Sequence, residues 1–133
     1  MADTVSTKVI MNTRKRLVLQ FLNLSDGTGE SAVVKVDKSA YTGVDGTEPH
    51  HFIVKTIQYS CTGMDVDLSF DRTTDIVIAR LSGSGFNDYM VGGAAGFVDS
   101  TTGDTGDIVL TTRNHTAGDS YDIIIELEKV GTV

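Results

Sequence analysis

The chain has 133 residues, of which 40% are hydrophobic, and its net charge is −7 at neutral pH with an isoelectric point near 4.7. A chain of this size is typical of one domain and can bury a core without disulfides or a metal. We therefore expect a single domain over residues 1–133. The acidic balance repels a phosphate backbone, so nucleic acid is not an expected partner.

Short apolar runs also limit the class of protein. The longest runs, such as 76–79 and 123–125, are far below the roughly 20 residues that a membrane-spanning helix needs. The start of the sequence has no basic region and no apolar segment typical of a signal peptide, so we expect neither membrane insertion nor export by that route. Cys61 is the only cysteine, which excludes an internal disulfide and favours a small core residue.

The spacing of apolar residues predicts β-strands throughout the chain. Between residues 64 and 70 an apolar side chain occupies every second position, with Asp65, Asp67 and Ser69 between them, and residues 121–128 alternate similarly. A shift of one residue would place carboxylates in the core, so the register is strongly specified. The expected strands are, in chain order, 4–11, 16–24, 31–37, 52–61, 64–70, 76–82, 108–112 and 120–130.

About eight short strands with regular turn signals predict an all-β fold, namely a β-sandwich of the immunoglobulin-like or the jelly-roll kind. The pattern does not choose between these two topologies. Residues 12–15 read as the turn of a first hairpin and residues 25–29 as a turn before the third strand, while 39–49 reads as a loop. Residues 108–112 and 120–130 are expected to pair as a final hairpin. We expect Leu68, Ile78, Ile123 and Ile125 in the core.

Residues 83–106 are rich in glycine and have no clean period, which predicts a long irregular segment. Such segments inside compact domains are usually functional or part of an interface. Interface cores favour aromatic residues and methionine. We therefore expect that the aromatic residues and the methionine of this segment include contacts with a partner or a second copy. These candidate interface residues are Phe86, Tyr89, Met90 and Phe97.

Arg14, Lys15 and Arg16 form the one basic cluster of the acidic chain. One interpretation is a solvated turn that discourages edge-to-edge aggregation. The other is a docking contact for an acidic patch on a partner, and we carry these three residues as candidate interface residues.

Catalytic and cofactor motifs are not recognisable in the sequence, so we expect no enzyme and no cofactor. His50 and His51 are neighbours on a strand and point to opposite faces, and His115 lies in a turn, so simple surface histidines are favoured over a metal site. Asp99, Asp104 and Asp107 lie close together in a glycine-rich turn. A calcium-binding site at this turn stays an open alternative, although the spacing does not match an EF-hand loop. The absence of tryptophan weakens a sugar-binding interpretation.

Four segments of the sequence resemble a known group. Residues 23–37 (NLSDGTGESAVVKVD), 105–112 (TGDIVLTT), 117–123 (AGDSYDI) and the opening 1–5 (MADTV) resemble small virion structural proteins of tailed bacteriophages. The resemblance runs nearly end to end and carries no catalytic signature, and it transfers no functional residues because the shared segments are turns and strand edges.

The resemblance implies a capsid decoration or cement protein that binds the outer shell and stabilises it. Its expected partners are the phage major capsid protein and copies of itself, as a homo-oligomer on the particle, and its expected location is the virion after synthesis in the host cytoplasm. Two alternatives stay open: a tail or neck component, such as an adaptor or fibre module, and a carbohydrate-binding adhesion module.

Overall fold

The computed structural model of the chain describes residues 4–13, 15–31, 33–37, 40–41, 51–72, 76–93, 96–97 and 104–130. These residues form nine strands and no α-helix, with a 3-10 turn at Val91–Gly93. The strands are β1 (Thr4–Asn12), β2 (Arg16–Leu24), β3 (Val33–Val36), β4 (His51–Thr62), β5 (Asp65–Arg72), β6 (Ile76–Leu81), β7 (Ser84–Asp88), β8 (Asp104–Arg113) and β9 (Ser120–Val130).

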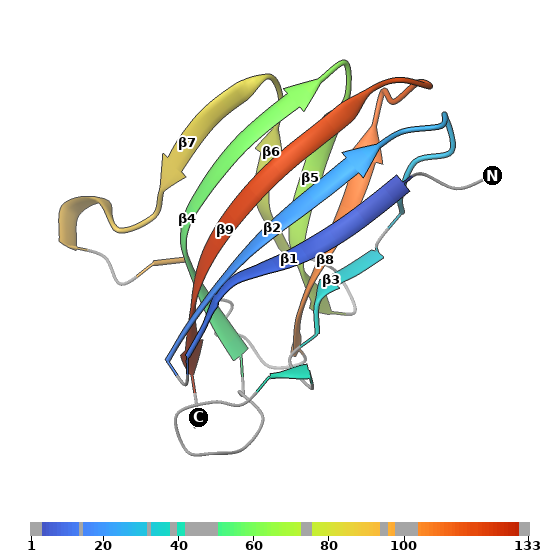
Figure 1. Ribbon diagram of the computed structural model, residues 1–133. Coiled ribbons are helices and arrows are strands. Elements are labelled where there is room, and N and C mark those ends of the chain that lie inside the picture. Colours follow the sequence, from blue (N-terminus) through green and yellow to red (C-terminus); the bar gives the residue numbers. More distant parts are fainter. Residues whose placement is uncertain are drawn as a thin grey trace.

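The strands form two antiparallel sheets that pack face to face, as Figure 1 shows. One sheet has the order β1-β2-β9-β4-β7 and the other the order β3-β8-β5-β6. The predicted all-β sandwich is therefore confirmed.

The pairing of the strands also selects the topology. β2 pairs with β9, β3 with β8, β4 with β7 and β5 with β6, so the eight strands after β1 form one long hairpin folded over itself. A wrapped hairpin of eight strands in two sheets is a jelly roll. β1 stands outside this pairing scheme and is added to the edge of the larger sheet beside β2.

The core lies between the two sheets and follows the period of two. Leu68, Ile123 and Ile125 are completely buried and Ile78 is 6% exposed, as predicted. Ser69 is buried although it stands at a predicted outward position, next to an irregularity in the β5–β6 pairing. The largest fully buried side chains are Leu17, Leu19, Phe21, Phe52, Ile57, Leu68, Leu81, Ile108, Leu110, Tyr121, Ile123 and Ile125.

Four short connections between the sheets lie at the same end of the sandwich. They join β2 to β3, β4 to β5, β6 to β7 and β8 to β9. Their common location follows from the registers, because Leu24 and Thr62 both stand next to Ser120. The backbone N–H of Cys61 donates to Gly83 O at 2.6 Å and brings the third connection to this end. We call this end the crossover end.

Two predicted connections are wrong. β8 and β9 do not form a hairpin, because residues 114–119 carry the chain from the smaller sheet to the larger one. Residues 83–106 are not wholly irregular, because they contain the edge strand β7 and the start of β8. β7 has no fully buried side chain, so its sequence lacks the apolar alternation that marks the other strands. The predicted loop 39–49 lies outside the described residues apart from Ala40 and Tyr41.

Truncation of Leu68 tests the register of β5. Leu68→Ala should lower the free energy of unfolding by about 2–5 kcal/mol, because the removed methyl groups fill a fully buried site. Asp67 is the matched control on the opposite face, where its carboxylate accepts hydrogen bonds from Arg113 Nε at 3.0 Å and Nη2 at 3.1 Å. Asp67→Ala should cost less than Leu68→Ala in urea unfolding, because Asp67 lies on the outward face and its partner Arg113 is 43% exposed. A larger loss for Asp67→Ala than for Leu68→Ala would contradict this register.

Candidate interaction surfaces

Phe86 and Met90 are exposed on and next to the edge strand β7. Phe86 is 60% exposed and pairs with Gln58, an exposed residue on the outer face of the larger sheet. Met90 is 36% exposed, and its neighbour Val91, which the sequence analysis did not single out, is 73% exposed. The strand and the turn that follows it therefore present three large apolar side chains to solvent.

Tyr89 and Phe97 instead pack against the core. Their rings meet edge to face at 5.8 Å, and Phe97 also lies 5.6 Å from Phe70. Tyr89 Oη donates a 3.3 Å hydrogen bond to Ile78 O, and Phe97 exchanges two backbone hydrogen bonds with Val54. Burial raises the pKa of Tyr89. These two aromatic residues thus hold the segment after β7 on the sandwich, and only part of the predicted set is available to a partner.

The basic cluster lies at the turn between β1 and β2. Lys15 and Arg16 are exposed, and Arg16 Nη1 forms a 2.6 Å ion pair with Glu126 Oε2 on β9. Arg14 lies outside the described residues. Strands β9 and β4 separate this corner from β7 in the sheet, so the structure does not unite the two predicted sets of interface residues.

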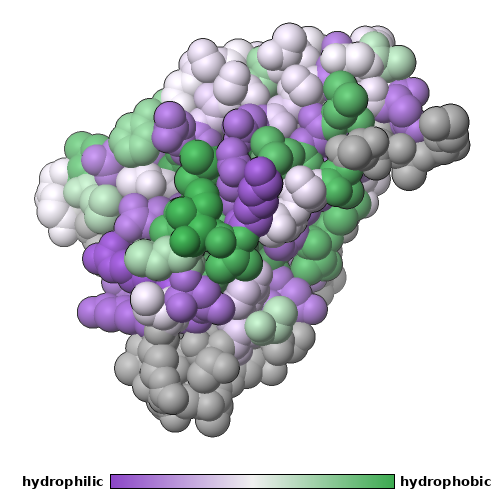
Figure 2. Space-filling view, viewed as in Figure 1, coloured by the Kyte–Doolittle hydropathy of each residue, from purple (hydrophilic) through white to green (hydrophobic). Residues whose placement is uncertain are grey.

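The edge strand β1 is the apolar surface that the sequence analysis missed. All described side chains from Val5 to Asn12 are exposed, although the strand was predicted correctly. Figure 2 shows hydrophobic side chains along this edge of the larger sheet. A partial signal was present in the sequence, because three consecutive polar residues at 6–8 interrupt the apolar period that marks a buried face.

Glu30 occupies a buried polar site at the crossover end. Its carboxylate accepts hydrogen bonds from Asn23 Nδ2 at 2.8 Å and Tyr121 Oη at 2.6 Å, and forms a 2.6 Å ion pair with Lys35 Nζ. The side chains of Lys35 and Glu30 are only 5% and 7% exposed. The backbones of Glu30 and Thr112 are also hydrogen-bonded, with Thr112 N donating to Glu30 O at 2.9 Å. We call this set of contacts the Glu30 latch.

His115 belongs to the same end and is not a simple surface histidine. Its Nδ1 lies 3.3 Å from Thr112 Oγ1, and its Nε2 lies 3.1 Å from Thr28 O. The ring therefore joins the connection after β2 to the connection after β8. His50 lies outside the described residues, as does the side chain of His51.

Metal sites are not found among the described residues, since no three His, Cys, Asp or Glu side chains there gather closely enough to hold an ion. The candidate calcium cluster is not tested, because Asp99 and the side chain of Asp104 lie outside the described part of the chain. Within that part, no helix is long and apolar enough to cross a membrane.

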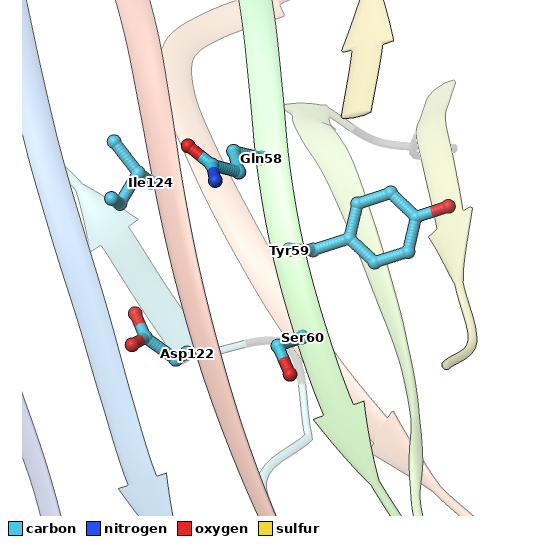
Figure 3. Close-up of a pocket in the computed structure, with 5 residues that line it drawn as sticks. All are labelled: Gln58, Tyr59, Ser60, Asp122 and Ile124. Carbon is cyan, nitrogen blue, oxygen red and sulfur yellow. The ribbon is translucent and has the colours of Figure 1, made fainter. Parts of the chain in front are cut away.

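A shallow depression lies on the outer face of the larger sheet. Its volume is about 90 Å³, and its lining residues are Gln58, Tyr59, Ser60, Asp122 and Ile124. Figure 3 shows Gln58 beside Ile124 and Ser60 beside Asp122, while the Tyr59 ring points away toward β7. Pockets for small ligands usually measure about 300–1,000 Å³. The polar groups of the depression include the Gln58 amide, the Ser60 hydroxyl and the Asp122 carboxylate, and this carboxylate accepts a 2.8 Å hydrogen bond from Gln20 Nε2.

Comparison with protein-family models, curated proteins and solved structures found no significant match to this chain.

Neutralisation of Glu30 tests the latch. Glu30→Gln should lower the free energy of unfolding by about 3–5 kcal/mol, because it leaves the Lys35 ammonium buried without its counter-charge. The double variant Glu30→Gln with Lys35→Met should regain much of this loss, since both charges are then absent. Arg16→Met, which breaks an exposed ion pair, is the control and should cost at most about 1 kcal/mol. Equal losses for Glu30→Gln and Arg16→Met in urea unfolding would show that the latch adds no special stability.

Cys61 should be chemically inert in the folded protein. Burial, with a smaller contribution from Asp65, raises the pKa of its thiol to about 11. Because the raised pKa reduces the thiolate at neutral pH, alkylation should be roughly a hundredfold slower than for an exposed thiol. Mass spectrometry should show slow labelling in buffer and rapid labelling in urea. Rapid labelling of protein that keeps its β spectrum would contradict this environment for Cys61.

Proposed function

We propose that this protein is a non-enzymatic structural protein of a tailed bacteriophage virion, which binds the outside of the capsid shell and stabilises it. The observation that carries the proposal is the distribution of exposed apolar side chains on an acidic sandwich. They are concentrated on the sheet edges, and the depression on the broad face of the larger sheet is far smaller than a ligand pocket. Contiguous exposed apolar surface commonly marks a protein interface.

The sequence resemblance and the topology support the same class. Jelly rolls are found in viral capsid proteins, and also in lectins and cupins, so the fold alone does not choose the function. The four segments that resemble phage virion proteins favour a role in the capsid over a role as a carbohydrate-binding lectin. A shell offers many equivalent binding sites, and multiple attachment would make weak single contacts effective.

The proposed contacts with the major capsid protein are the turn after β7 and the basic cluster at the turn between β1 and β2. Met90 and Val91 are 36% and 73% exposed on the turn after β7, and Lys15 is exposed at the turn between β1 and β2. Apolar contacts would provide affinity at the first surface. Attraction to acidic groups on the shell would guide docking at the second.

Binding of the purified chain to capsids that lack it tests this proposal. The chain should sediment with these capsids and increase their resistance to heat. The double variant Met90→Ser with Val91→Ser should weaken binding by about tenfold or more, because it removes exposed apolar contacts, and its melting temperature should stay unchanged. Val77→Ser is the matched control, since Val77 is 38% exposed on an edge of the other sheet.

Three results would overturn parts of the proposal. Retention on isolated tails but not on capsids would favour a tail or neck component. Retention on host polysaccharide alone would favour an adhesion module. Strong capsid binding by the Met90 and Val91 variant would keep the function but move the contact surface elsewhere.

A further inference from the structure

β1 is an edge strand whose two faces are both uncovered. Within the described residues it has a strand neighbour on one side only, β2. Val9 pairs with Leu19, which is completely buried, and yet Val9 is 55% exposed. Paired residues share a face of the sheet, so Val9 lies on the core side at a position that the smaller sheet does not cover. β1 therefore contributes no buried side chain to the sandwich among its described residues.

β7 is the opposite edge of the same sheet and is similarly open. Within the described residues its strand neighbour is β4 alone. The described chain has eleven exposed large apolar side chains, and seven of them lie at these two edges. Four belong to β1 and three to β7 with its following turn; they are Val5, Val9, Ile10, Met11, Phe86, Met90 and Val91. Natural edge strands are usually short, charged or covered, which prevents them from pairing with other chains.

The two edges carry opposite charge. Residues 4–24, which span β1 and β2, hold four basic residues and no acidic residue in a chain whose net charge is −7. Residues 84–93, which span β7 and the turn after it, hold Asp88 and no basic residue. Two β1 edges brought together would repel each other through their positive charge, and Lys8 near the middle of the strand would increase that repulsion. A β1 edge that faces a β7 edge avoids both the repulsion between two positive edges and the added repulsion between two Lys8 side chains.

We propose that the free edge of β1 pairs with the free edge of β7 of a second copy of this chain, so that the larger sheets join into one sheet across the copies. Each copy then offers one edge of each kind, and the contact is head to tail, as in rings and filaments. Val9 and Phe86 then stand on the two strands that meet at this contact. This self-association does not depend on attachment to a phage particle.

Sedimentation velocity of the purified full chain tests the contact. The wild-type chain should form oligomers with increasing concentration, and salt should weaken them because it screens the opposite charges. Val9→Glu blocks the β1 edge and Phe86→Lys blocks the β7 edge, and each variant alone should associate at least about tenfold more weakly. Val77→Glu, a similar change on the edge of the smaller sheet, should associate as the wild type does.

A mixture of the two blocked variants gives the decisive result. In a head-to-tail contact, the intact β7 of the Val9→Glu chain can pair with the intact β1 of the Phe86→Lys chain. The mixture should therefore form dimers and nothing larger, although each variant alone is a monomer. Should either variant melt at a lower temperature than the wild type, Lys8→Glu and Phe86→Ser replace them at the same edges.

Each other outcome overturns the proposal. A wild-type chain that stays monomeric at its highest soluble concentration excludes the contact. Oligomers that survive both blocking changes place the interface elsewhere. If Val9→Glu alone abolishes association and Phe86→Lys does not, two β1 edges pair with each other, and the mixture is not rescued. Failure of capsid binding leaves these results unchanged, so the proposed function and this contact are tested separately.

Discussion

A buried carboxylate at the crossover end holds the two sheets in their relation to each other. A charged group in the interior is tolerated only when hydrogen bonds and an opposite charge compensate for lost hydration. Glu30 meets this condition through Asn23 on β2, Lys35 on β3 and Tyr121 on β9, so its three partners come from both sheets. Four connections between the sheets lie at this end, so the Glu30 latch joins both sheets where the chain passes from one to the other.

Backbone hydrogen bonds also join the connections at the crossover end. Residues of three segments, 23–37, 105–112 and 117–123, lie at this end. Ser25 N donates to Asp119 O at 2.7 Å, and Gly118 N donates to Ser25 O at 2.9 Å. A side chain on Gly63 would also collide with Asp119, and its φ of +82° suits glycine. The folding of the sandwich constrains the sequence of these segments, while the exposed apolar side chains lie mainly elsewhere, on β1 and around β7.

Sequence patterns predicted most strands because one side of each strand enters the core. The bounds of β2 and β9 are confirmed residue by residue, since buried and outward positions alternate along both strands. β7 could not be found in this way, because an edge strand with no buried residue has no apolar period to detect. The pairing of β8 with β9 was predicted wrongly for a different reason. Residues 114–119 have the composition of a hairpin turn, and Asn114 has the positive φ that such turns often contain. The sheet that each strand joins, however, depends on long-range contacts, which the residues of a turn do not determine.

The features that should stabilise the fold lie at the crossover end, whereas the proposed contact between copies lies at the β1 and β7 edges. None of the four short connections and none of the latch residues belongs to β1, whose described side chains are exposed rather than buried. Stability should therefore depend on the eight wrapped strands, while the proposed association would depend on the two edges of one sheet. The charge distribution reinforces this division: eighteen acidic residues keep copies apart at long range, and none of them lies within the β1–β2 segment. Repulsion between whole molecules would then oppose random aggregation, while short-range attraction at the β1 edge selects the orientation in which two copies can meet.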